Sequence, residues 1–189
     1  MTKLIGLSGS LRKRSFNSAL LRTAVELMPP GTKMTVGSIR NIPLYDGDLE
    51  DAQGIPAPAQ VLKDAIAAAD GLLLVTPEYN NSIPGVFKNA IDWLSRPPAD
   101  ISRVFGGKPV AIIGASPGGF GTILSQEAWL PVLRTLGTRP WFGARLLVSR
   151  AATVFDESGR IVNEATKEQL REFIDGFVTS VRSIPSHEA

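Results

Sequence analysis

Short apolar runs alternate with amphipathic helical patterns along this chain, and this alternation constrains the fold more than any other feature. The runs have the length and apolar character of strands, most of them fully buried, and glycines and prolines punctuate the pattern. Strands that alternate with helices form parallel sheets with right-handed crossovers. The sequence therefore predicts an α/β fold, a doubly wound five-stranded parallel sheet with helices on both faces and strands at residues 4–7, 33–39, 71–75, 109–114 and 141–148.

The helical patterns repeat apolar residues at spacings of three and four. They predict helices over residues 20–28, 61–69, 86–94 and 170–181, and another that ends near residue 136. Pro131 lacks a backbone donor, so we expect that helix to bend or break there. The strand at residues 33–39 is more polar than the others and is expected near a sheet edge. Residues 95–107 are expected to form a loop and residues 41–58 a long irregular connection, either functional or an ordinary surface loop.

Composition narrows the function classes. The 189 residues fit one domain, 1–189. The absence of cysteine excludes thiolate catalysis, and with only one histidine we expect no metal site. The net charge of +2, with no basic stripe, argues against nucleic acid as a partner. We expect no signal peptide, and no apolar run is long enough for a membrane span, so we also expect no membrane contact and a cytoplasmic location. His187, in a polar tail, is expected to have no chemical role.

The sequence SGSLRKRSFN at residues 8–17, here called the first loop, joins the first strand to the first helix. Such a junction presents unpaired backbone N–H groups, serine hydroxyls and the positive end of the helix dipole to an anion. Arg12, Lys13 and Arg14 add positive charge, and Arg12 can give a phosphate two parallel hydrogen bonds. The first loop is thus a candidate phosphate cradle; an ordinary strand-to-helix turn with solvated basic residues is the alternative.

Two more polar loops follow predicted strands: the second loop at residues 76–85 and the third loop at residues 115–122. Loops at the carboxyl ends of parallel strands share one rim, and ligands bind where the strand order reverses. With the order 2-1-3-4-5, that reversal lies between the strands that carry the first and second loops, and the third loop is the next neighbour. The three loops together predict a crevice for a phosphorylated ligand with a flat hydrogen-bonding ring.

Other motif interpretations fail on particular residues. Phe120 occupies the lysine position of a Walker A loop, and no G-x-G-x-x-G follows the first strand. Gly114, Ser116 and Gly118 match the G-x-S-x-G elbow of serine hydrolases. Pro117, however, lacks the N–H that the oxyanion hole needs from the residue after the nucleophile. A serine hydrolase is therefore a weak alternative.

With these residues assembled, the sequence closely resembles the NADPH-dependent FMN reductase family of flavodoxin-like proteins, which includes bacterial quinone and chromate reductases. The resemblance rests on the first loop, on IPLYD at residues 42–46, on TPEYN at 76–80 with SIPG at 82–85, on KNAIDWLS at 88–95 and on GKPV at 107–110. It covers roughly the first 120 residues in motif detail and the remainder in pattern. It implies a single flavodoxin-like FMN-binding domain.

The resemblance also implies the binding roles. The first loop would hold the FMN phosphate, with Ser10, Arg12, Ser15 and Asn17 as direct ligands. The second loop would meet the isoalloxazine ring, largely through backbone amides, and the third would approach its pyrimidine side. The implied cofactor-binding residues are Ser10, Leu11, Arg12, Lys13, Arg14, Ser15, Phe16, Asn17, Pro77, Glu78, Tyr79, Asn80, Asn81, Ser116, Gly118 and Gly119.

The resemblance implies an FMN-dependent oxidoreductase that takes hydride from NADPH or NADH and passes electrons to quinones or other small oxidants, such as free flavin, chromate or azo compounds. The flavin does the chemistry, so no catalytic side chain is expected. A homodimer or homotetramer is implied. The alternatives are a non-enzymatic FMN electron carrier or redox sensor, and an apo interaction module. Carriers are usually strongly acidic around the flavin, whereas this chain is nearly neutral, which favours small-molecule acceptors.

Overall fold

A parallel sheet with the strand order β2-β1-β3-β4-β5 forms the centre of the molecule, as the sequence predicted. The computed structural model describes residues 1–184, so His187 lies outside the described residues. The more polar second strand is indeed at the sheet edge. The strands are β1 (Thr2–Ser8), β2 (Thr32–Gly37), β3 (Gly71–Val75), β4 (Pro109–Ala115), β5 (Arg139–Pro140) and β6 (Leu147–Val148).

The last predicted strand, at residues 141–148, is wrong in its extent. Two short strands replace it: β5 pairs with the beginning of β4 and β6 with its end. Between them the chain leaves the sheet after Trp141, whose ring packs edge-on against Phe173 at a centroid distance of 4.9 Å. Burying this large aromatic surface against the last helix outweighs continued strand pairing, which Pro140 already limits because it has no N–H.

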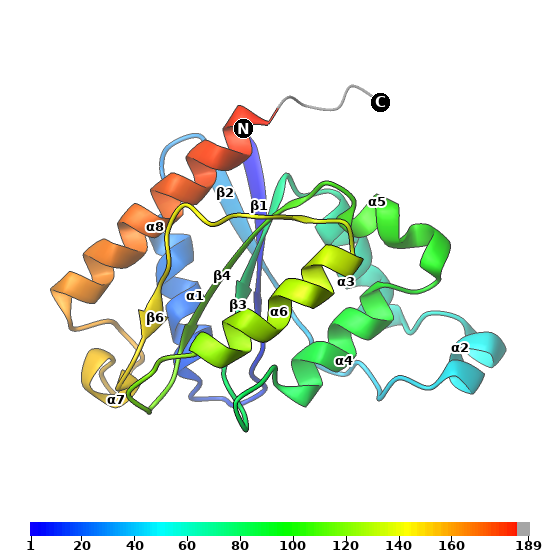
Figure 1. The fold of residues 1–189 in the computed structure, drawn as a ribbon, viewed down its shortest axis with the longest axis horizontal. Coiled ribbons are helices and arrows are strands. Elements are labelled where there is room, and N and C mark those ends of the chain that lie inside the picture. Colours follow the sequence, from blue (N-terminus) through cyan, green and yellow to red (C-terminus); the bar gives the residue numbers. More distant parts are fainter. Residues whose placement is uncertain (185–189) are drawn as a thin grey trace.

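The helices cover both faces of the sheet (Figure 1). Helices α1 and α8 pack on one face, and α3, α4, α5 and α6 pack on the other. Within residues 1–184, no helix is long and apolar enough to cross a membrane. The helices are α1 (Phe16–Glu26), α2 (Gly47–Gln53), α3 (Ala57–Ala67), α4 (Gly85–Leu94), α5 (Ile101–Phe105), α6 (Ile123–Thr135), α7 (Ala151–Val154) and α8 (Glu164–Ser183).

Three local expectations need correction. Residues 41–58 are not irregular throughout, because α2 forms within them and α3 begins at Ala57. The Asp46 side chain starts α2 by accepting a hydrogen bond from the N–H of Asp48 at 2.9 Å. The loop predicted at residues 95–107 contains the short helix α5. Helix α6 continues through Pro131, which is exposed, so water can reach the carbonyl that loses its partner.

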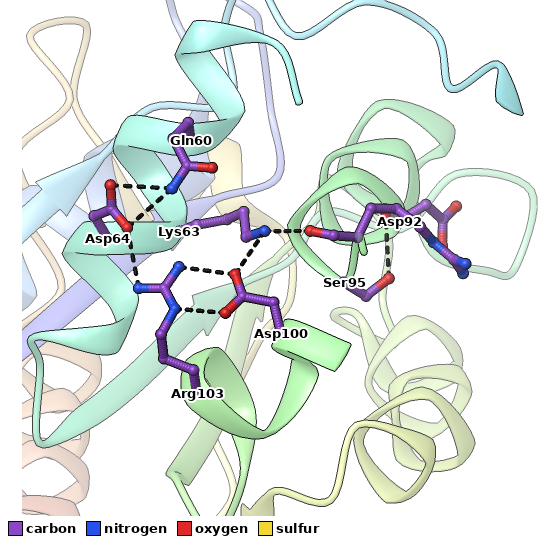
Figure 2. A network of polar contacts seen from close by, with 8 residues as sticks. Gln60, Lys63, Asp64, Asp92, Ser95, Asp100 and Arg103 are labelled. Carbon is purple, nitrogen blue, oxygen red and sulfur yellow. Dashed lines mark hydrogen bonds and ion pairs between the residues drawn. The ribbon is translucent and has the colours of Figure 1, made fainter. Parts of the chain in front are cut away.

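A polar network anchors the segment around α5 to α3 (Figure 2). Lys63 of α3 is 1% exposed, and its ammonium pairs with Asp100 at 2.8 Å and donates to the carbonyl of Arg96. Arg103 clamps the same carboxylate with two hydrogen bonds of 2.6 and 2.8 Å and reaches Asp64 at 3.0 Å. These bonds hold the pKa of Asp100 well below its usual range. The network orders a connection that sequence patterns leave as a loop.

Candidate functional site

The three polar loops leave the carboxyl ends of β1, β3 and β4 at one edge of the sheet, near the bottom of Figure 1. Backbone bonds tie each loop to the adjacent strand at its root. The N–H of Gly9 donates to the carbonyl of Val75 at 2.9 Å, and the N–H of Thr76 donates to the carbonyl of Ile113 at 2.8 Å. The strand order therefore brings the loops together, as strand-order reasoning expected.

The first loop presents a row of free backbone donors at the start of α1. Ser15 caps the helix, and its hydroxyl oxygen accepts from the N–H of Ser18 at 3.2 Å. The hydroxyl oxygen of Ser10 accepts from the N–H of Arg12 at 3.3 Å. Within residues 1–184, no protein acceptor meets the N–H groups of residues 13–17. These groups and the helix dipole form an electropositive cradle.

The basic side chains of the first loop face solvent. Arg12, Lys13 and Arg14 are exposed and line a hollow of about 270 Å³ between α1 and the turn at residues 156–159. Across this hollow, hydrogen bonds from Ser158 and from the backbone of Arg160 lower the pKa of Asp156 to about 2. The excess of basic side chains at the cradle favours an anionic ligand.

Gly9 lets the first loop lie close to α4. A Cβ atom at this position would stand 2.2 Å from a ring carbon of Phe87, which is fully buried. Any larger residue would push the loop off the helix. The close approach also places the cradle beside the second loop, because α4 begins where the second loop ends.

The side chain of Asn17, which the resemblance implies as a phosphate ligand, is engaged by the protein itself. Its side chain is buried, and both amide atoms bond to the backbone of Ala115: Nδ2 donates to the carbonyl at 2.8 Å, and Oδ1 accepts from the N–H at 2.9 Å. Only its backbone N–H remains free for a phosphate. The side chain instead joins the first loop to the third.

The second loop ends in a tight hairpin. Tyr79 and Ser82 exchange two backbone hydrogen bonds of 3.1 and 3.2 Å, and Asn80 and Asn81 form the turn between them. Both asparagines adopt left-handed backbone angles, with φ of 50° and 61°, which asparagine tolerates better than most residues. The hairpin presents Tyr79, Asn80 and Asn81 to solvent at the site edge.

Two contacts fix the base of the second loop on α6, a buried one at Thr76 and a more exposed one at Glu78. The hydroxyl of Thr76 meets the Ser125 hydroxyl at 2.8 Å and accepts from the Trp129 indole at 3.1 Å. The carboxylate of Glu78 accepts hydrogen bonds from the N–H groups of Leu124 and Ser125 at 2.9 and 3.0 Å. The Glu78 side chain is thus already engaged, while Pro77 is buried beside it.

The third loop depends on glycine and on inward-facing hydroxyls. A Cβ on Gly114 would lie 2.1 Å from the Thr122 hydroxyl and 2.2 Å from the Thr76 carbonyl. The Ser116 hydroxyl donates to the carbonyl of Gly121, so it points into its own loop. This geometry gives a second reason against a hydrolase elbow. Gly118 and Gly119 are exposed and have open space around them.

Sequence reasoning missed the groups that hold the third loop from the far side. Ser116 receives support from β6, because its N–H donates to the carbonyl of Val148 at 3.0 Å. Arg150, in a left-handed conformation with φ of 48°, donates its N–H to the carbonyl of Gly118 at 2.8 Å. No local pattern marks Val148 or Arg150, because both hold the third loop through main-chain atoms. Phe120, at the loop tip, is 83% exposed.

Comparisons with known proteins agree with this geometry. The family model of NADPH-dependent FMN reductase matches residues 2–153. The chain is 42% identical over 182 residues to an NAD(P)H-dependent FMN reductase of Pseudomonas aeruginosa, covering 96% of each chain. It is 39% identical over 180 residues to a 2-hydroxy-1,4-benzoquinone reductase of a Burkholderia species, covering 95% of this chain and 96% of the relative.

A solved structure shows the same arrangement. The flavoenzyme NAD(P)H:(acceptor) oxidoreductase FerB of Paracoccus denitrificans superposes with a TM-score of 0.85 at 34% identity. The match covers 96% of this chain and 98% of that protein. The likeness therefore extends over the sheet, the helices and the loops at its edge.

Proposed function

The chain belongs to the NADPH-dependent FMN reductase family, and from this membership we propose that it oxidises NADPH or NADH through bound FMN and reduces quinones. It is an NAD(P)H-dependent flavin enzyme of the flavodoxin-like fold, with residues 1–189 proposed as one FMN-binding domain. The structural observation that carries the proposal is the row of free N–H groups at residues 13–17, at the edge where two further loops meet.

The residues of the first loop fit the phosphate of FMN. The backbone donors of residues 13–17, two serine hydroxyls and the helix dipole suit a dianion, and Arg12 can add a charge-assisted pair. We propose that residues 10–17 hold this phosphate. Asn17 contributes its backbone N–H, since its side chain is bound to Ala115.

The second and third loops fit a flat ring. We propose that the backbone of residues 77–81 and of Ser116, Gly118 and Gly119 borders the isoalloxazine. The glycines have no side chain to block an approach, and their surroundings are open. Main-chain N–H groups aimed at the ring would stabilise the negative charge that the ring gains on reduction.

When bound, FMN would supply the redox chemistry, which is hydride transfer from the nicotinamide and two-electron reduction of the acceptor. The protein's part is to bind, orient and tune. We propose that no side chain acts as an essential acid or base. The Glu78 carboxylate and the Ser116 hydroxyl are both engaged in holding loops.

The acceptor is proposed to be a small molecule. The chain has a net charge of +2, whereas electron carriers attract protein partners with a strongly acidic surface. Quinones are the first acceptors that we propose, because a relative at 39% identity is a 2-hydroxy-1,4-benzoquinone reductase. Free flavin, chromate and azo compounds are further candidates. A cytoplasmic location is proposed because the reductant NAD(P)H is supplied there.

We also propose a homodimer or homotetramer. An apolar groove of about 360 Å³ lies between α6 and the segment that separates β5 from β6, and Phe142 beside it is 72% exposed. Exposed apolar patches of this kind favour association. Glu127 and Arg145 line the same groove, so two copies related by a two-fold axis can pair opposite charges.

An anaerobic titration tests the proposed function. The protein is saturated with FMN, NADPH or NADH is added in separate cuvettes, and the flavin absorbance is followed before a quinone is admitted. We expect rapid bleaching and recovery with quinone. Flavin that binds but is not reduced by either nucleotide would indicate an electron carrier or sensor. No flavin binding would overturn the assignment of the site.

A further inference from the structure

We propose that Glu78 is a positioning residue for the flavin site, and that its carboxylate sets the spacing between the second and third loops by capping α6. This inference rests on the proposed function, because the two loops are the proposed borders of the isoalloxazine. It assigns to the Glu78 side chain a task that involves no contact with the ring.

The cap on α6 comes from a distant part of the chain. Thr122, the residue that precedes the helix, makes no side-chain capping bond. Instead, one carboxylate oxygen of Glu78, 46 positions earlier than Leu124, accepts from the N–H groups of Leu124 and Ser125. A negative charge at this end is also favoured by the helix dipole. Helix α6 therefore depends on the second loop for its own first turn.

A second attachment lies directly behind the first. Thr76 is fully buried, and its hydroxyl contacts both Ser125 and Trp129 of α6. The backbone of residues 76–78 is thus fastened to α6 at two points, and the hairpin at residues 79–82 extends beyond them. The Glu78 bonds add a second fixed point beyond Thr76, on the side of the loop that faces α6.

The third loop is fixed by the same anchor, because it ends where α6 begins. A shift of the first turn of α6 would move Gly121 and Thr122, and with them the exposed glycines at 118 and 119. The Glu78 carboxylate consequently links the two proposed ring borders, while Asn17 links the third loop to the phosphate cradle. Side-chain hydrogen bonds thus link all three loops.

Three substitutions at this position separate geometry from charge. Glu78→Gln keeps an oxygen that can accept both hydrogen bonds and removes the charge. Glu78→Asp keeps the charge but shortens the reach by one methylene. Glu78→Ala removes both. Asn163→Ala is the matched control, since Asn163 caps α8 by accepting from the N–H of Thr166 at 2.8 Å and is not among the residues of the three loops.

For each variant, the FMN dissociation constant is measured by flavin fluorescence quenching, and the stability of the apo-protein by urea denaturation. We expect Glu78→Ala and Glu78→Asp to weaken FMN binding about tenfold and Glu78→Gln to restore it to within about threefold of the parent. Asn163→Ala should lower the apo-protein stability and leave FMN affinity unchanged.

The outcomes distinguish the inference from the proposed function. If the parent protein binds FMN and Glu78→Ala binds it equally well, Glu78 is only a helix cap, and the inference fails while the function stands. If Asn163→Ala loses affinity as much as Glu78→Ala, the effect is general destabilisation and the inference again fails. If the parent itself does not bind FMN, both the function and the inference fail.

Discussion

The side-chain amide of Asn17, in the first turn of α1, forms two hydrogen bonds with the backbone of Ala115, the last residue of β4. The two residues are 98 positions apart in sequence. Both bonds are buried, so they are protected from competition by water. The pairing holds the first and third loops in one register at the edge of the sheet.

Asn17→Ala should therefore reduce stability and FMN affinity together. It leaves the N–H and carbonyl of Ala115 buried without partners, which costs about 2 to 4 kcal/mol of unfolding free energy. Urea denaturation of the apo-protein and FMN titration measure the two effects. Asn17→Asp keeps the size but sets an acceptor against the Ala115 carbonyl and a negative charge beside the cradle, so it should bind FMN no better than the alanine variant. An alanine variant with unchanged stability would contradict the role assigned to the pair.

Arg12→Ala should weaken FMN binding by several-fold to a hundredfold, since a charge-assisted hydrogen bond contributes ~1 to 3 kcal/mol. The side chain is exposed, so the fold should be unaffected. Fluorescence titration with FMN measures the change. Arg171→Ala, on the exposed side of α8, removes an equal charge within a surface ion pair and should change neither quantity. Equal FMN affinity in both variants would refute the cradle.

Asp100→Asn should destabilise the protein in a pH-dependent way. The substitution leaves the buried Lys63 ammonium with a weaker partner, at a cost of roughly 2 kcal/mol near neutral pH, because Asp100 is 24% exposed and solvent softens the loss. The hydrogen bonds from Arg103 and Lys63 lower the pKa of Asp100 in the folded state. Its contribution is then present above the unfolded pKa of about 3.9 and is lost as the pH falls further.

Urea denaturation of the parent and of Asp100→Asn between neutral pH and about pH 3 tests this linkage. The difference in unfolding free energy should be largest at neutral pH and shrink below about pH 4. Asp175→Asn, at an exposed position on α8, is the control and should show little difference at any pH. A difference for Asp100→Asn that stays constant with pH would show that the carboxylate charge is unimportant.

Gly114→Ala should destabilise the protein by roughly 2 to 3 kcal/mol, because the added Cβ meets a backbone carbonyl that cannot move freely. Gly119→Ala provides the contrast, since no atom lies within 4 Å of the added Cβ. Thermal denaturation should separate the two variants clearly. We expect Gly119→Ala to keep the parental stability and to lose FMN affinity, as the added methyl group enters the proposed ring site. Equal stability of the two variants would rule out the close packing of β4 against the second loop.

Phe142→Asp should shift the chain toward the monomer, because it places a charge on the apolar groove proposed as the interface. Light scattering after size-exclusion chromatography measures the mass. Val61→Asp is the control, because it also replaces an exposed apolar residue with aspartate. Val61 is 71% exposed on α3 and lies outside the groove. Val61→Asp should leave the assembly intact. A Phe142→Asp variant that keeps the parental mass would direct the search for the interface elsewhere.

Much of the fold can be read from local patterns. Apolar runs such as residues 71–75 specify buried strands, and apolar spacing in residues 170–181 specifies α8, because both signals depend on which side chains must leave water. The position of the polar loops at the carboxyl ends of the strands follows from the strand–helix alternation, and the predicted strand order is that of flavodoxin-like proteins. The sequence motifs also identified the family to which the chain belongs, on the strength of the first and second loops together.

Other features depended on packing between distant segments. In place of the strand expected at residues 141–148, β5 ends at Pro140 and β6 begins at Leu147, and between them Trp141 packs on α8. Helix α5 forms where Lys63 and Arg103 supply partners to Asp100. Arg103 is a local partner at spacing i,i+3, but Lys63 belongs to α3 and is too distant in the sequence for a local pattern to indicate the outcome.

The candidate site divides in the same way. The sequence by itself determined the residue types of the three loops, and these indicate a ligand with an anionic group and a flat ring. Hydroxyls, glycines and basic side chains have the same chemistry wherever they lie. The use of each side chain was decided only by the tertiary structure. The side chains of Asn17 and Glu78 bond to Ala115 and to the first turn of α6, a use that no local pattern indicates. Hydrogen-bonding groups take whichever partners folding brings within reach, and those partners lie 98 and 46 positions away.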